Sequence, residues 1–359
     1  MNSLLKNRLF DLMKQTAAAV DAFVLNELST ISRDSLVPVE AIVHLPKIRA
    51  KPRGHDARPK LRATFVRLIF EMLSNKDWQT IVPLAAAGEL LAVSSYVIDD
   101  LLDNQKMRSA ELATWVVHGQ ADAIMAAQIQ REVAERILLR LDIPEPLILR
   151  LVAGLNHIFY QGYLGQLLDS RMKLPCPMSH YIKRCEHIAG QFHGGLARMA
   201  ATFAGAQDEI VEQLGGLGFS QGIALQIRND LVDYLPASII AAAGAHALER
   251  SPFEDFRNGK WTMPLLYAHE HADSSDRELV ASLMIDRPLS DDAATRLTRI
   301  LMKTGAYEAT LQEITAYKKN AHQILTEFSE SPAREAMATL LETVENGRSY
   351  VDRLLAETQ

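Results

Sequence analysis

Apolar positions recur with helical spacing along most of the chain. They fall three and four residues apart in segments rich in Ala, Leu, Glu, Gln, Arg and Met, and β-type alternation is rare. The prolines and glycine of 36–59 predict a loop. No composition shift or fixed repeat divides the chain, so the pattern indicates one all-α domain over 1–359, with an N-terminal helix and loop over 1–50 and the main bundle over 51–359. The predicted helices are 1–30, 60–75, 79–104, 112–140, 146–171, 179–206, 208–235, 261–272, 275–286, 290–303, 306–328 and 332–356.

One predicted helix is apolar nearly all round and then ends in acids. Residues 82–98 read VPLAAAGELLAVSSYVI, which is typical of a helix inside a bundle. Asp99 and Asp103 follow, four residues apart and therefore on one helix face, with Asp100 beside them. Like charges at the end of a buried segment are unfavourable unless a cation lies between them. Mg²⁺ is the cation that such hard oxygen ligands favour, together with phosphate oxygens.

A second cluster repeats this arrangement. Residues 224–235 read ALQIRNDLVDYL, where Asn229 and Asp233 are four apart and Asp230 lies beside them. Two such clusters on separate helices would face each other across a cavity and hold two or three Mg²⁺ ions. The ions and nearby basic residues would then stabilise the charge of a departing diphosphate.

Composition and charge exclude several other classes of protein. Hydrophobic residues make up 48% of the chain, enough for a sizeable core, and a net charge of −6 argues against nucleic acid as a partner. Two cysteines fit neither a zinc pattern nor a disulfide scaffold, so a reducing cytoplasm is expected. The charged N-terminus does not resemble a signal peptide. The apolar run 237–248 is too short to span a bilayer, and no integral membrane segment is expected.

The two clusters and three further segments resemble the polyprenyl synthetase family, the trans-isoprenyl diphosphate synthases. DDLLD matches the first aspartate-rich motif of that family, and NDLVD matches the second with Asn in place of its first Asp. The similarity runs from about residue 50 to the C-terminus, in the expected order. The segments that carry it are GHDARP (54–59), DDLLD (99–103), GQLLD (165–169), NDLVD (229–233) and EDFRNGKWTMPLLYA (254–268).

The resemblance implies a fold, a chemistry and a set of site residues. The fold is an isoprenoid-synthase-type helical bundle around a deep apolar cavity, usually dimeric. Its members ionise an allylic prenyl diphosphate with Mg²⁺. The resemblance assigns Mg²⁺ binding to Asp99, Asp100, Asp103, Asn229, Asp230 and Asp233. It assigns the diphosphate to Arg108, Gln226 and Lys260, the reacting end to Gln166 and Asp169, and the floor of the prenyl pocket to Ser94, Ser95 and Tyr96.

The sequence departs from the family where isopentenyl diphosphate would bind. The family has Lys and Arg in the GKRLRP segment and a second Arg after the first motif, whereas this chain has His55, Asp56 and Ser109. Each lost charged contact is worth about 1.5–3 kcal/mol, so three losses would lower the affinity by several powers of ten. Lys60 and Arg62 lie close by in the sequence. On the allylic side, Ile188 and Ala189 replace a Lys-Thr pair.

These departures predict a particular activity. The protein would ionise an allylic diphosphate and pass the prenyl group to an acceptor other than isopentenyl diphosphate, or cyclise it as terpene synthases do. The alternative is ordinary chain elongation with isopentenyl diphosphate. A second alternative is a non-catalytic partner subunit, against which the retained DDLLD, NDLVD, Arg108 and Lys260 argue.

Overall fold

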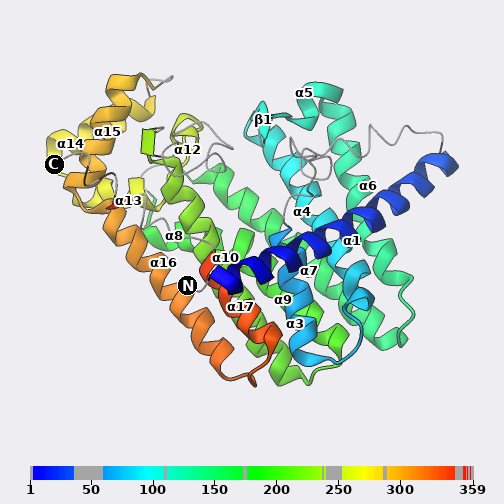
Figure 1. The fold of residues 1–359 in the computed structure, drawn as a ribbon. Helices are drawn as coiled ribbons and strands as arrows, with labels where there is room; N and C mark the ends of the chain where they lie inside the picture. Colours follow the sequence, from blue (N-terminus) through cyan, green and yellow to red (C-terminus); the bar gives the residue numbers. More distant parts are fainter. Residues whose placement is uncertain are drawn as a thin grey trace. The chain divides into compact units, whose positions relative to one another are not determined.

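The protein is almost entirely helical in the computed structural model (Figure 1). The structure describes residues 3–35, 60–108, 111–172, 176–236, 238–239, 253–285, 289–343, 351–352, 354 and 356. The chain forms two compact units. Unit 1 comprises Met1–Gly162, Gln191–Phe219 and Ala321–Thr343, and unit 2 comprises Tyr163–Gly190, Ser220–Asn320 and Val344–Gln359. The single domain expected over 1–359 stays a prediction.

Unit 1 contains the N-terminal helices and the first acidic cluster. Three helices, α7 (Glu145–Arg171), α10 (Asp208–Asp233) and α16 (Ala306–Thr326), begin in one unit and end in the other. The elements wholly inside unit 1 are α1 (Ser3–Ser35), α3 (Leu61–Leu73), the 3₁₀ turn η1 (Trp78–Ile81), α4 (Val82–Leu102), the strands β1 (Met107–Arg108) and β2 (Glu111–Leu112), α5 (Thr114–His118), α6 (Gln120–Leu139), α9 (Gln191–Ala204) and α17 (Pro332–Thr343).

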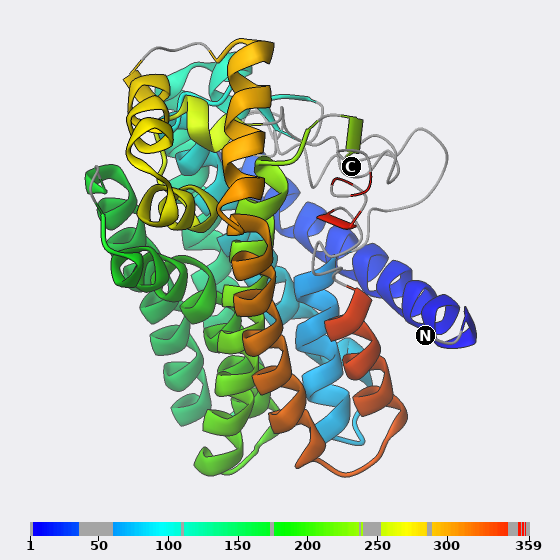
Figure 2. The same ribbon diagram turned by 90° about the vertical axis from the view of Figure 1, so that its left-hand side faces the viewer.

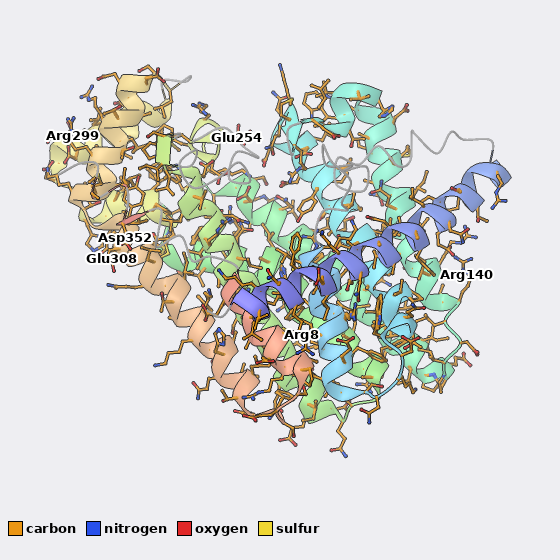
Figure 3. All side chains as sticks on the ribbon, viewed as in Figure 1. Arg8, Arg140, Glu254, Arg299, Glu308 and Asp352 are labelled. Atoms are coloured by element: carbon orange, nitrogen blue, oxygen red, sulfur yellow. The ribbon has the colours of Figure 1, made fainter. Side chains whose placement is uncertain are left out.

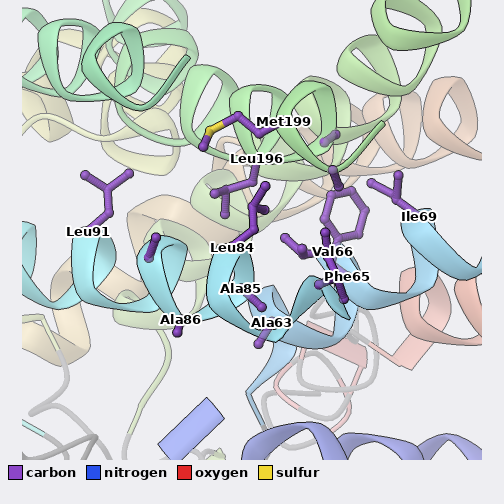
Figure 4. Packing of buried hydrophobic residues seen from close by; sticks show 14 of the residues in the cluster. Ala63, Phe65, Val66, Ile69, Leu84, Ala85, Ala86, Leu91, Leu196 and Met199 are labelled. Atoms are coloured by element: carbon purple, nitrogen blue, oxygen red, sulfur yellow. The ribbon is translucent and has the colours of Figure 1, made fainter. Parts of the chain in front are cut away.

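Helix α4 is the central element of unit 1. It packs against α1, α3 and α6, and Figure 4 shows its apolar side chains meeting those of α3 and α9. Leu84 and Leu91 on α4 lie with Leu196 and Met199 of α9 in one buried cluster. By length and composition alone, the segment Trp78–Leu102 could cross a membrane, but 78% of its apolar window is buried inside the protein. Such burial is typical of a core helix.

Unit 2 carries the second acidic cluster. Its own elements are α8 (Met178–Cys185), the π-turn η2 (Glu186–Gly190), α12 (Glu254–Arg257), α13 (Met263–His271), α14 (Ser274–Ile285) and α15 (Asp291–Lys303). Figure 2 shows α16 lying beside α10, and within unit 2 Asn320 of α16 donates a hydrogen bond of 2.7 Å to Ser220 of α10. The Tyr307 hydroxyl, also on α16, donates to the carbonyl of Tyr234 at 2.7 Å. These two polar contacts, the second of them buried, join α16 to α10 and to the residue that follows it.

Most predicted helices are confirmed, two are wrong in detail, and part of the helix expected over 332–356 lies outside the described residues. The helix expected over 112–140 begins as a strand at Glu111–Leu112 and is broken at Gly119, whose φ of 85° is unfavourable for any residue with a side chain. The helix expected over 179–206 contains the π-turn Glu186–Gly190. The predicted loop over 36–59 lies outside the described residues.

Candidate functional site

The first acidic cluster lies at the C-terminal end of α4. Asp103 caps that helix, and its N–H donates to the carbonyl of Asp99 at 2.9 Å. Asn104 then adopts a left-handed φ of 53°, and the chain turns into the hairpin of β1 and β2, where Arg108 pairs with Glu111. The hairpin therefore returns Arg108 to the acids that precede it by only a few residues.

Arg108 pairs with two of the three aspartates. Its Nε lies 2.7 Å and 2.8 Å from the two carboxylate oxygens of Asp100, and its Nη2 lies 3.2 Å from Asp99. Asp100 and Arg108 are both buried, whereas Asp99 and Asp103 are partly exposed. The structure thus brings all four predicted residues together, with Asp100 turned toward the protein and the other two aspartates nearer to solvent.

Tyr96 links Arg108 to a buried ionic network. Its ring contacts two guanidinium groups, with Arg108 Cζ 4.7 Å and Arg62 Cζ 5.4 Å from the ring centroid. Its hydroxyl accepts a hydrogen bond of 2.7 Å from Arg62, which also pairs with Glu89 at 3.4 Å. Burial opposes the charge of Arg62, but Glu89 raises its pKa above the usual value, with a smaller contribution from Tyr96.

The network continues to the N-terminal helix. Lys60 is buried and pairs with Asp21 of α1 at 3.0 Å. Lys60 and Arg62 are the first two cations of the described chain after the 36–59 segment, and both are held by carboxylates of their own unit.

Of the other predicted pocket residues, Ser94 is buried, and Ser95 is exposed with its hydroxyl donating to the carbonyl of Ala92 at 2.7 Å. The prenyl-pocket role of Ser94, Ser95 and Tyr96 stays a prediction.

In the second cluster, both acids are buried, and Asp230 is held by side chains. One carboxylate oxygen accepts from the Tyr181 hydroxyl at 2.8 Å and from Arg184 at 2.9 Å, and the other accepts from Gln226 at 2.8 Å. Burial raises the pKa of Asp230 above its ordinary range, although the charge of Arg184 opposes this shift. Gln226 therefore orients a carboxylate in this structure, and its predicted contact with diphosphate stays a prediction.

The other two residues of this motif lie in different surroundings. Both carboxylate oxygens of Asp233 accept backbone N–H groups, from Glu254 and Asp255 at 3.0 Å each, so Asp233 caps the start of α12, where Figure 3 labels Glu254. Asn229 is exposed, and its side-chain oxygen accepts from Arg228 at 3.2 Å.

The predicted reacting-end residues lie near the end of α7, in unit 2. Asp169 pairs with Arg184 at 2.6 Å and with Lys260 at 3.3 Å. Burial disfavours its charge, but Arg184 and Lys260 together hold the pKa of Asp169 below the ordinary value. Gln166 lies one turn earlier and is half-buried. Gly165 permits the close packing here, because a Cβ at that position would lie 2.4 Å from the side chain of Ile188.

The two clusters differ in how well they fit a metal ion. Asp99 and Asp103 are hard oxygen donors one helical turn apart on the more exposed side of their cluster, which suits Mg²⁺. In the second cluster, Arg184, Tyr181, Gln226 and two backbone N–H groups occupy most acceptor positions of Asp230 and Asp233. Within the described ranges, no group of three or more His, Cys, Asp or Glu side chains is arranged to hold a metal ion.

A separate pocket of about 480 Å³ lies in unit 1 at the opposite end of α4. Phe23, Pro83 and Phe203 contribute to its lining, and at its rim Glu27 pairs with Arg140, which Figure 3 labels. Pro83 precedes Asp99 by 16 positions of the same helix, so the pocket lies about 24 Å along α4 from the acids. It is too far from them to hold a diphosphate at the first cluster.

Sequence reasoning missed three charged or polar residues of these clusters. Glu89 carried a signal, because a single acid inside the apolar run 82–98 needs a buried partner. Arg184 and Tyr181 carried no such signal in the sequence. They lie in a polar helix, and the sequence does not show which of its side chains are buried in the folded protein.

Comparisons with known proteins agree with this architecture. The family model described as polyprenyl synthetase matches residues 48–301. A nonaprenyl diphosphate synthase of Mycobacterium tuberculosis is 26% identical over 286 residues, covering 79% of this chain and 81% of the relative. The solved structure of a geranylgeranyl pyrophosphate synthetase from Pyrococcus horikoshii has a TM-score of 0.80 at 22% identity, covering 94% and 98% of the two chains. That of a Corynebacterium glutamicum geranylgeranyl pyrophosphate synthase, complexed with isoprenyl diphosphate and magnesium, has a TM-score of 0.75 at 17% identity, covering 94% and 99%.

The all-α fold and the acidic motifs at its helix ends define an isoprenoid synthase. The chain belongs to the polyprenyl synthetase family, because the family model covers well over half of its length. It is accordingly an enzyme of the prenyltransferase class. The sequence-based predictions of family, fold class and enzyme class are thereby confirmed.

Proposed function

We propose that the protein elongates an allylic prenyl diphosphate with isopentenyl diphosphate. The observation that carries this proposal is the match of residues 48–301 to the polyprenyl synthetase family, with the aspartate-rich motifs in order. The M. tuberculosis relative is a prenyl diphosphate synthase by name, which supports the same reaction. The comparisons therefore favour the alternative of the sequence analysis over its main prediction of a different acceptor.

In this reaction, Asp99 and Asp103 would hold Mg²⁺. The bound ion would supply Lewis-acid stabilisation of the negative charge that develops on the leaving diphosphate. Magnesium in the C. glutamicum neighbour supports this choice of ion. Arg108, already placed against Asp99 and Asp100, would orient those carboxylates and offer its guanidinium to the phosphate oxygens.

A second candidate function is transfer to another acceptor, or cyclisation. The observation that favours it concerns the cations near the isopentenyl diphosphate segment. His55, Asp56 and Ser109 stand where the family has Lys or Arg, and these positions lie outside the described residues. Lys60 and Arg62, the nearest described cations, are held by Asp21 and Glu89, and these ion pairs argue against their taking over the missing phosphate contacts.

One product analysis decides between the two candidates. The protein would be incubated with Mg²⁺ and each of geranyl, farnesyl and geranylgeranyl diphosphate, with and without isopentenyl diphosphate, and the products identified by mass spectrometry. We expect a longer prenyl diphosphate only when isopentenyl diphosphate is present. Release of diphosphate with no elongation, together with a cyclic or acceptor-linked prenyl product, would instead support the second candidate.

Replacing one metal-binding acid tests whether the chain is catalytic at all. Asp99→Ala removes a proposed Mg²⁺ ligand and is expected to lower Mg²⁺-dependent diphosphate release at least a hundredfold. Asp208→Ala is a matched control, because that carboxylate is 82% exposed and belongs to neither motif, and it should retain wild-type activity. Equal, near-zero release by wild type and both variants would favour the non-catalytic subunit.

We also propose a homodimer in a reducing cytoplasm. One side of α7 carries Leu149, Tyr160 and Leu167, each more than half exposed, and Met125 of α6 is equally exposed. An apolar stripe of this kind on a helix surface is typical of a protein interface. Cys176 and Cys185 are both free, in keeping with the proposed compartment.

A further inference from the structure

Arg184 has an unusual position in unit 2. It lies on α8 with only 4% of its surface exposed, and its guanidinium is shared between two carboxylates from different helices. Nη1 donates to Asp169 of α7 at 2.6 Å, and Nη2 donates to Asp230 of α10 at 2.9 Å. One cation thereby joins the acids of two motifs that the sequence analysis treated separately.

The contacts of Asp230 leave little room for a metal ion. A carboxylate oxygen accepts about two hydrogen bonds. One oxygen of Asp230 already accepts from Tyr181 and Arg184, and the other accepts from Gln226 alone. A metal ion could therefore coordinate Asp230 through the second oxygen only, as long as Arg184 stays in place.

The two acids that Arg184 joins are also balanced in charge, whereas the neighbouring buried acids Asp233 and Asp255 add negative charge to the cluster. Asp169 and Asp230 carry two negative charges, and the cations paired with them are Arg184 and Lys260. A divalent ion that approaches Asp230 would meet a carboxylate whose charge Arg184 already offsets at short range. In a buried setting, where screening is weak, a fixed positive charge opposes the binding of another cation.

We propose that Arg184 is a positioning residue that acts as a built-in cation of the second motif. It orients Asp169 and Asp230, restricts Asp230 to a single metal-facing oxygen, and weakens metal binding at NDLVD when no substrate is present. Metal ions would then bind first through Asp99 and Asp103. The inference rests on the proposed metal-dependent reaction, but its test measures metal binding and unfolding in place of turnover.

The test compares Arg184→Met with Arg184→Lys. Met has a similar size without the charge. Lys keeps the charge but lacks the planar guanidinium group that donates to two carboxylates at once. Both changes are made in full-length protein that also carries Asp99→Asn and Asp103→Asn, so that the titration reports the second motif. Mn²⁺ binding is followed by the electron paramagnetic resonance signal of the free ion. The protein with Asp99→Asn and Asp103→Asn alone is the background. We expect Arg184→Met to bind Mn²⁺ at least tenfold more tightly than this background, and Arg184→Lys to bind it within threefold of the background.

A third variant and a stability measurement complete the test. Adding Asp230→Asn to Arg184→Met should return Mn²⁺ affinity to the background value. Arg184→Met should unfold at lower urea than the background in EDTA, and Mg²⁺ should restore more stability to it than to the background. If it does not fold in EDTA, refolding in Mg²⁺ but not in NaCl of equal ionic strength supports the inference.

Three results would overturn the inference. These are unchanged or weaker Mn²⁺ binding in a folded Arg184→Met protein, tighter binding that persists after Asp230→Asn, and failure of Mg²⁺ to restore stability or folding. The proposed function fails separately, if the wild-type protein releases no diphosphate from any allylic substrate.

Discussion

At the scale of single residues, the candidate site is a set of acids, several of which pair with an arginine. Arg108 pairs with Asp99 and Asp100 in unit 1, and Arg184 pairs with Asp169 and Asp230 in unit 2. Spacing within a helix predicted which acids lie together, because i and i+4 share a face. It did not predict which cation each acid would receive, because those cations come from other elements.

The buried ion pair of Arg62 and Glu89 leads to a prediction about stability at the scale of one residue. Arg62→Met would remove the ion pair of Arg62 with Glu89, whose side chain is 5% exposed. Removing one partner of a buried pair costs about 3–5 kcal/mol, so the free energy of unfolding by urea should fall by that amount. Arg150→Met is the control, because Arg150 and its partner Asp208 are 47% and 82% exposed, and an exposed pair is worth at most about 1 kcal/mol. Equal losses in the two variants would contradict the buried network.

At the scale of elements, the break between α5 and α6 shows what helical periodicity misses. The apolar pattern continues through 112–140, but Gly119 has φ 85° and ψ 163°, a conformation open essentially to glycine alone. A single residue of this kind ends one helix and begins another without changing the apolar spacing on either side. The hairpin before it, which positions Arg108, is likewise too short to produce an alternating pattern.

The same substitution at two glycines should have opposite effects. Gly119→Ala should destabilise the protein by about 1–3 kcal/mol, because the backbone conformation is strained for any side chain. Gly162→Ala, in the interior of α7, should stabilise it by about 0.5–1 kcal/mol. A Cβ at either position would have nothing within 4 Å, so steric clashes do not contribute to the difference between the two variants. Urea unfolding of both variants measures the difference, and effects of the same sign would show that the backbone argument is wrong.

At the scale of the whole molecule, the exposed apolar side of α7 leads to a prediction about assembly. Leu149→Arg with Tyr160→Arg should convert a wild-type particle of twice the chain mass into one of a single chain mass, measured by size-exclusion chromatography with light scattering. Both residues are 58% exposed, so the change should not disturb the fold. Leu4→Arg, at an exposed position of α1, should leave the mass unchanged. A monomeric wild-type protein would contradict the homodimer.

The sequence alone determined the all-α class, the position of most helices and the family, because helical periodicity and short motifs are local properties of the chain. It also determined the two acidic clusters, whose members lie within one helical turn of each other. Only the tertiary structure decided that Asp230 is bound by Arg184 and Tyr181, that Asp233 caps α12, and that Tyr96 contacts two arginines. These contacts join residues far apart in the chain, and which of them form depends on packing that no local pattern encodes.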